Sequence, residues 1–152
     1  MAVDVQTEIV IQRPIDEVSA FAGDPSKACD WYVNIKSVRW ETSPPLVLGS
    51  RVSYVASFLG KELAYTYEVV ELEPGRRLVM RTDEGPMPME TTYEWFELPG
   101  DVLSTRMTLR NRGEAKGLQA FTAPLLSWSM RRANLLDLDC LKRRLEAAPS
   151  KN

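Results

Sequence analysis

The sequence predicts an α+β fold in which one seven-stranded antiparallel sheet wraps around a long C-terminal helix. Three observations lead to this prediction. Short segments with apolar residues at every second position recur from Val3 to Arg112, separated by turns rich in Gly and Pro. Two short helical segments interrupt them after the first strand. From Gly117 to about Ala147 the apolar residues follow a helical period instead.

The first strand and the two short helices lie between Val3 and Trp31. Residues 3–12 alternate between apolar and polar side chains, as a half-buried strand does. Pro14 then occupies the start of a helix whose first turn is acidic and which ends at Gly23. A second short helix begins at Asp24-Pro25, with Asp24 as its cap, and runs to about Trp31.

Six further strands are predicted in a meander. The best marked is a hairpin over 61–82, where Glu73-Pro74-Gly75-Arg76 has the Pro and Gly of a type II turn. Because each remaining segment is bounded by turn residues, we expect consecutive strands to pair. The other predicted strands are 35–42, 51–58, 89–98 and 104–112.

The C-terminal helix carries a stripe of large apolar residues spaced three or four apart. A helix of this length, without a partner helix of similar size, must bury such a stripe against the sheet. The stripe consists of Leu118, Phe121, Leu125 and Trp128, followed by Leu135, Leu138, Leu141 and Leu145.

The composition fits one cytoplasmic domain. The 152 residues are enough for a single core, so we expect one domain over 1–147 and a disordered tail over 148–152. The net charge is −2 without a long basic run, which argues against a nucleic-acid partner. The N-terminus lacks the pattern of a signal peptide, and no apolar run is long enough to span a membrane. Cys29 and Cys140 match no metal spacing and are expected to be reduced, a single disulfide being the alternative.

The chain contains no histidine. This excludes Ser-His and Cys-His nucleophile pairs, histidine zinc sites and the commonest general base. We therefore expect neither a metal nor a cofactor. Catalysis, if present, must use carboxylates, tyrosines, lysines or positioned water, which favours a binding protein over an enzyme.

Several segments in this order resemble a known family. They are Arg13-Pro14 with the following Ile15-Asp16-Glu17-Val18, Asp24-Pro25 leading to Trp31, Leu48-Gly49-Ser50-Arg51, the hairpin from Tyr67 to Leu78, and Ser104 to Thr108. Together they resemble the START/Bet v 1-like (SRPBCC) superfamily, and within it the polyketide cyclase/dehydrase and lipid-transport-like group. The resemblance spans nearly the whole chain. It implies the helix-grip fold and a cavity for a hydrophobic ligand, while the oxygenase branch is excluded because its iron site needs histidines.

The meander places the cavity opening at one end of the sheet. Successive turns alternate between the two ends, so residues 59–60, 84–89 and 113–118 meet where the long helix begins. The superfamily's entrance is similarly placed. Each expected wall residue has ordinary core packing as its alternative, and the tyrosines are the strongest candidates because a buried hydroxyl needs a partner. The candidate ligand-binding residues are Trp31, Tyr54, Phe58, Tyr65, Tyr67, Met80, Met87, Met107, Phe121, Leu125 and Trp128.

The strand over 89–98 has two different faces. Glu90, Thr92, Glu94 and Phe96 share one, and the aromatic residues at 93 and 95 share the other. An inward glutamate face would make Glu94 a buried carboxylate and a candidate general base. Burying two carboxylates is costly, so the aromatic face is expected to look inward.

Three functions follow from these observations. The first is binding or transport of a lipid-like or aromatic small molecule. The second is a cyclase or dehydratase in which a cavity tyrosine or carboxylate moves protons. The third is a module that binds a partner protein through its sheet. Besides the ligand, a monomer or homodimer is expected.

Overall fold

The structure is a computed structural model that describes residues 2–58, 60–82, 88–114 and 119–147. The predicted tail over 148–152 therefore lies outside the described residues. The observed elements are β1 Ala2–Ile11, α1 Ile15–Ala22, the 3₁₀ turn η1 Pro25–Lys27, α2 Ala28–Trp31, β2 Ile35–Trp40, β3 Arg51–Phe58, β4 Lys61–Glu73, β5 Arg77–Thr82, β6 Met89–Leu98, β7 Ser104–Glu114 and α3 Gln119–Ala147.

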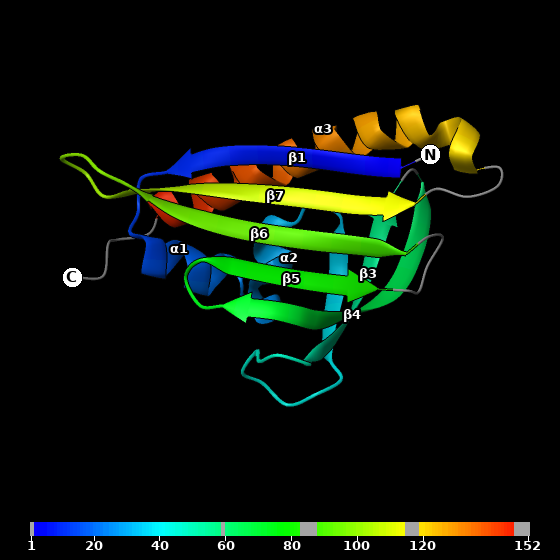
Figure 1. Cartoon of the computed structure of the whole chain (residues 1–152), viewed down its shortest axis with the longest axis horizontal. Coiled ribbons are helices and arrows are strands. Elements are labelled where there is room, and N and C mark those ends of the chain that lie inside the picture. The colour runs from blue at the N-terminus through cyan, green and yellow to red at the C-terminus, as the bar shows by residue number, and fades with distance from the viewer. Residues whose placement is uncertain (1, 59, 83–87, 115–118, 148–152) are drawn as a thin grey trace.

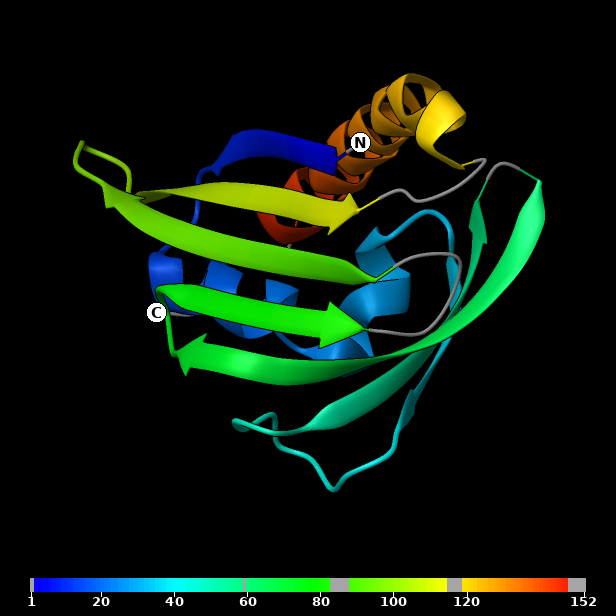
Figure 2. The same ribbon diagram turned by 45° about the vertical axis from the view of Figure 1, so that its right-hand side comes forward.

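All seven strands form one antiparallel sheet in the order β1-β7-β6-β5-β4-β3-β2. Consecutive strands from β2 to β7 pair as expected of a meander, whereas β1 joins the sheet beside β7. The sheet is strongly curved, and α1, α2 and α3 lie on its concave side (Figure 1, Figure 2). The predicted α+β class and the helix-grip architecture are confirmed.

The residues expected to begin helices and to form the turn after β4 have these roles in the structure. Pro14 has an extended conformation and precedes α1, whose first turn contains Asp16 and Glu17. The Asp24 side chain accepts a hydrogen bond from the Ser26 N–H at 2.9 Å and so caps the turn η1. Gly75 has a φ of 77° in the turn between β4 and β5, a conformation that glycine adopts without steric cost.

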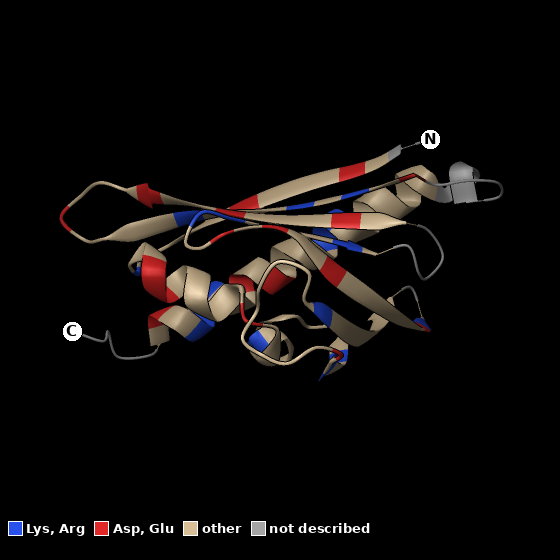
Figure 3. Ribbon diagram, turned by 60° about the horizontal axis from the view of Figure 1, so that its bottom comes forward, with Lys and Arg blue, Asp and Glu red and all other residues tan. Residues whose placement is uncertain are grey.

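The two faces of β6 are resolved as expected. Tyr93 and Trp95 are buried on the concave side, each with 4% of its surface exposed. Glu90 and Glu94 instead lie on the convex side, where they pair with arginines of β5. Acidic and basic residues alternate across the strands (Figure 3). Because water and cross-strand arginines stabilise these carboxylates, Glu94 is not a buried general base.

The orientation of α3 was only half predicted. Leu138 and Leu141 are fully buried, and Leu145 nearly so, as the stripe required. The expectation that Leu125 and Trp128 face inward was wrong, since they are 56% and 59% exposed. The inward side of this half of the helix instead carries Leu126 and Met130 together with small and polar residues, which a stripe through Leu125 and Trp128 does not include. They include Ala123, Asn134 and Asp137, and Leu135 is exposed as well.

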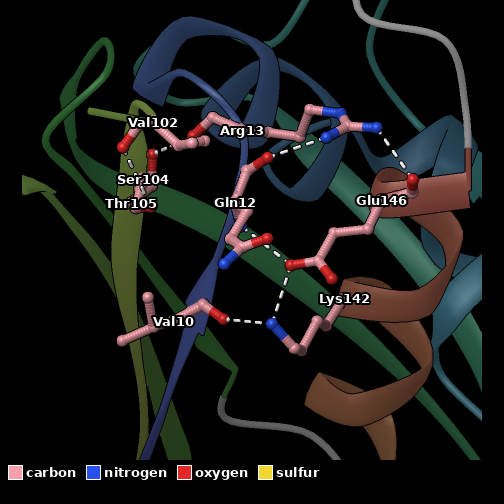
Figure 4. A network of polar contacts seen from close by, with 8 residues as sticks. All are labelled: Val10, Gln12, Arg13, Val102, Ser104, Thr105, Lys142 and Glu146. Atoms are coloured by element: carbon pink, nitrogen blue, oxygen red, sulfur yellow. Dashed lines mark hydrogen bonds and ion pairs between the residues drawn. The ribbon is translucent and has the colours of Figure 1, made fainter. Parts of the chain in front are cut away.

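The end of α3 is fastened to the end of β1 by a group of polar contacts that we call the strand–helix clamp (Figure 4). The Glu146 carboxylate accepts from the Gln12 N–H at 2.8 Å and from the Lys142 ammonium at 2.7 Å. Lys142 also donates to the Val10 carbonyl, and Arg13 donates to the Glu146 carbonyl, both at 2.8 Å. These bonds between charged and backbone groups fix the helix against the first strand.

We expect Glu146→Ala to lower the free energy of unfolding by about 1 kcal/mol, because two hydrogen bonds to a partly exposed charged group are lost. Asp139→Ala is the matched control: it removes an exposed ion pair with Arg143 on the same helix, without any contact to β1. Urea unfolding followed by circular dichroism measures both. Equal losses in the two variants would contradict the role assigned to the clamp.

Candidate functional site

A cavity of about 390 Å³ lies between the concave side of the sheet, α2 and α3. Its volume falls within the range of pockets that bind small molecules. The wall is largely apolar and aromatic, and polar side chains of the sheet and of α3 interrupt it. The sheet contributes residues from β2 to β7, and α3 contributes Leu126, Met130, Ala133, Asn134 and Asp137.

The structure brings six of the predicted wall residues together around this cavity: Trp31, Tyr54, Phe58, Tyr65, Tyr67 and Met80. Met107 is fully buried and does not line the cavity, because it packs in the core beneath it. Leu125 and Trp128 lie on the outer side of α3. Met87 lies outside the described residues, and so does the side chain of Phe121.

Of the described residues expected at the opening, Met89 lines the cavity, and 60, 88, 113 and 114 do not. Lys61 is exposed and lines the cavity, and Phe58 and Met89 line it nearby. The other residues expected at the opening, 59, 84–87 and 115–118, lie outside the described residues. The opening therefore stays a prediction.

Three tyrosines of β3 and β4 form an aromatic wall. The rings of Tyr54 and Tyr65 stack with centroids 5.8 Å apart, and Tyr67 meets Tyr65 edge-on at 5.4 Å. Tyr54 and Tyr65 are cross-strand partners, which explains why their rings lie side by side. Burial raises the pKa of both hydroxyls. They stay neutral at physiological pH and can donate to a ligand oxygen.

A second tyrosine pair joins α2 to the sheet. The hydroxyls of Tyr32 and Tyr93 share a short hydrogen bond, and the Tyr32 ring packs at a tilt against Trp31 with centroids 4.0 Å apart. Burial raises the pKa of both hydroxyls well above the usual value. Neither tyrosine was among the predicted wall residues. The alternation of β6 pointed to Tyr93 once its aromatic face was taken as inward.

A chain of hydrogen bonds crosses the cavity wall from α3 to β4. Asn134 donates from its side-chain amide to the Asn111 oxygen at 2.6 Å, and Asn111 donates to the Thr91 hydroxyl at 2.9 Å. Thr91 in turn lies 3.1 Å from the Tyr67 hydroxyl. Each polar group is therefore held in place before a ligand arrives, which is how binding sites fix orientation.

Asp137 is the titratable carboxyl group of α3 that faces the cavity. Its side chain is only 3% exposed, and it accepts a hydrogen bond from the Val33 N–H at 2.9 Å. Desolvation raises the pKa of this carboxyl to about 6, although the bond from Val33 opposes the shift. Asp137 was not among the predicted site residues, because the inward side of α3 was assigned from large apolar residues. Its spacing of three from Asn134, and its position next to Leu138, were the available signals.

Three further features of the described residues bear on function. No group of three His, Cys, Asp or Glu side chains there is arranged to hold a metal ion. Cys29 and Cys140 are both free. Within the same residues, no helix is both long enough and apolar enough to cross a membrane.

The raised pKa of Asp137 makes stability depend on pH with a defined sign. The unfolded carboxyl titrates near its usual value of about 4, so folding favours the protonated form. The contribution of this group to stability is greatest below about pH 4, and up to about 3 kcal/mol of it is lost as pH rises through the folded pKa of about 6. We expect Asp137→Asn to remove this loss, because the amide oxygen can still accept from Val33.

Urea unfolding at several pH values tests this expectation. The free energy of unfolding of Asp137→Asn should exceed that of the unaltered chain at pH 7, and the difference should vanish near pH 4. Asp139→Asn, an exposed carboxyl two residues along the same helix, serves as the control. A difference between Asp137→Asn and the unaltered chain that does not vary with pH would contradict the assignment.

Comparisons with known proteins agree with this architecture. The family model described as polyketide cyclase / dehydrase and lipid transport matches residues 2–146. No curated protein matches the sequence.

Solved structures of the same fold include an aromatase/cyclase and a START superfamily protein. The Zhui aromatase/cyclase from Streptomyces sp. R1128 is 18% identical, with a TM-score of 0.80 over 99% of this chain and 100% of the other. A START superfamily protein from Mycobacterium smegmatis is 14% identical, with a TM-score of 0.79 over 95% and 97% of the two chains. A protein from Thermus thermophilus is 21% identical, with a TM-score of 0.77 over 97% and 99%. The chain thus belongs to the polyketide cyclase/dehydrase and lipid transport family.

Proposed function

We propose that this protein binds a small, largely apolar molecule with a few oxygen atoms in the cavity between the sheet and α3. The observation that carries the proposal is the composition of the cavity wall. Aromatic and aliphatic side chains provide most of it, and polar side chains of the sheet and of α3 are placed among them. Such a wall favours a hydrophobic body that carries a few polar groups.

The hydrogen-bonding groups restrict the ligand further. The hydroxyls of Tyr54 and Tyr65 are neutral donors suited to a ligand carbonyl. Asn134 and Asp137, on the opposite side, offer acceptor oxygens for a ligand hydroxyl. A planar polycyclic molecule with both carbonyl and hydroxyl groups, such as a hydroxyanthraquinone, meets these requirements and is a practical probe.

Cavity binding can be tested with two variants of different severity. Ala133→Trp places a large ring in the cavity and should weaken binding of a hydroxyanthraquinone at least tenfold. Tyr65→Phe keeps the aromatic wall but loses one donor, and should weaken binding by roughly fivefold to tenfold, the usual effect of one hydrogen bond. Isothermal titration calorimetry measures both affinities, and native mass spectrometry of the freshly purified chain shows whether a small molecule is retained.

Trp128→Ala is the matched control, because Trp128 is on the same helix but faces away from the cavity. It should bind the probe like the unaltered chain. Unchanged binding by both Ala133→Trp and Tyr65→Phe, with circular dichroism showing folded protein, would place the probe elsewhere and refute the proposal.

A cyclase or dehydratase is the second candidate, and Asp137 is the observation that favours it. A carboxyl group with a pKa of about 6 inside a cavity can take a proton at neutral pH and return it. It would accept a proton from a carbon between two ligand carbonyls, and the resulting enolate would attack a third carbonyl carbon to close a ring. The tyrosine hydroxyls would stabilise the developing oxyanion, and loss of water from the resulting alcohol requires no oxidant.

The enzymatic candidate predicts that a poly-β-keto thioester is converted to a cyclised product. Liquid chromatography with mass spectrometry should show a loss of water from the substrate mass, and Asp137→Asn should reduce the rate at least a hundredfold. Tight binding without turnover would leave only the binding function. The third hypothesis, a protein-interaction module, predicted a cavity too small for a ligand, and the volume of about 390 Å³ gives it no support.

A further inference from the structure

The outward side of α3 exposes large apolar side chains together with arginines. Leu125, Trp128, Leu135 and Leu136 have 56%, 59%, 49% and 53% of their surfaces exposed. Their successive spacings of three, seven and one keep them on the side of the helix that faces away from the sheet. The outer α3 face is defined by Leu125, Trp128, Arg131, Arg132, Leu135 and Leu136.

The same turns of α3 line the cavity on their inward side. Leu126, Met130 and Ala133 contribute to the cavity wall, whereas Leu125 and Trp128 beside them in sequence are exposed. The two sides are separated by one helix diameter, about 10 Å. Any surface bound to the outer α3 face therefore lies close to the ligand cavity without blocking its wall.

The charge of this face is positive although the whole chain carries −2. The Arg132 guanidinium lies 5.7 Å from the centre of the Trp128 ring, and Arg131 donates to the Gln6 carbonyl at 3.0 Å. Over the described part of the chain, neither arginine forms an ion pair with a carboxylate. The acidic residue at the edge of the face, Asp139, is paired with Arg143.

This combination fits a surface that is both negatively charged and able to accept apolar side chains. Tryptophan and arginine are suited to the region of lipid headgroups, where a ring can insert and a guanidinium can bind phosphate. A second copy of the chain is a poorer match, because a two-fold contact would bring the same arginines together. Charge complementarity therefore selects an anionic bilayer.

We propose that the outer α3 face docks onto the surface of an anionic lipid bilayer, with Trp128 inserted among the headgroups and Arg131 and Arg132 bound to phosphates. Docking is peripheral and reversible, because two arginines and a few side chains give only modest affinity. It does not depend on which ligand occupies the cavity.

Vesicle co-sedimentation of the full chain tests this proposal. Binding should be clear with vesicles of mixed phosphatidylcholine and phosphatidylserine, weak with phosphatidylcholine alone, and reduced by added salt. We expect Trp128→Ala and the double variant R131E/R132E each to weaken binding to mixed vesicles, the latter by about tenfold or more.

Two control variants distinguish binding through the outer α3 face from a general effect of an exposed ring or of net charge. Phe96→Ala removes an exposed ring that also lies under an arginine, Arg106, but on the convex side of the sheet. R39E/R51E makes the same change in net charge on β2 and β3. Both should bind mixed vesicles like the unaltered chain.

Three outcomes would overturn the proposal. One is the absence of binding to mixed vesicles, and another is an equal loss in the control variants. The third is a difference in sedimented mass between Trp128→Ala and the unaltered chain without vesicles. Such a difference would show that a second copy of the chain covers the face. Because the hydroxyanthraquinone titration does not involve vesicles, it reports on the cavity independently.

Discussion

The pairing of β1 with β7 is the constraint on which the rest of this structure depends. It joins the first strand to the last over ten residue pairs, from Ala2 opposite Glu114 to Ile11 opposite Thr105. Without it, the meander from β2 to β7 would have no strand beside the start of α3. With it, α3 packs along β1, and the strand–helix clamp fixes the end of the helix. The concave side of the sheet is thereby covered, and the cavity is enclosed.

Most of the fold could be predicted from local sequence signals. The strands over 51–58 and 89–98 agree with β3 and β6 at both ends, because turn residues bound them and their side chains alternate. The face of β6 was predictable from the cost of burying Glu90 and Glu94. Pairing of β1 with β7 could not be derived from local pattern, because the two strands stand first and last among the strands of the chain.

The cavity was harder to predict than the fold. Tyr54, Tyr65 and Tyr67 were found because alternation placed them on one face of their strands. Asn134 and Asp137 were missed, since a polar residue on a helix is ordinarily assigned to solvent. Their inward position is stable only because Asn111 and the Val33 N–H supply hydrogen bonds, and such partners from distant parts of the chain are invisible in a local pattern.

The helix α3 is held unevenly along its length. Its 29 residues span about 43 Å, and the clamp lies within the last two turns. Arg131 and Asn134 add hydrogen bonds to β1 and β7 in the middle of the helix. Towards the opposite end, Ala123 packs against Val3 and Val5 through apolar contacts, which have no preferred direction. Leu126 and Met130 belong to this end, so their part of the cavity wall is held by less directional interactions than the part formed by Asn134 and Asp137.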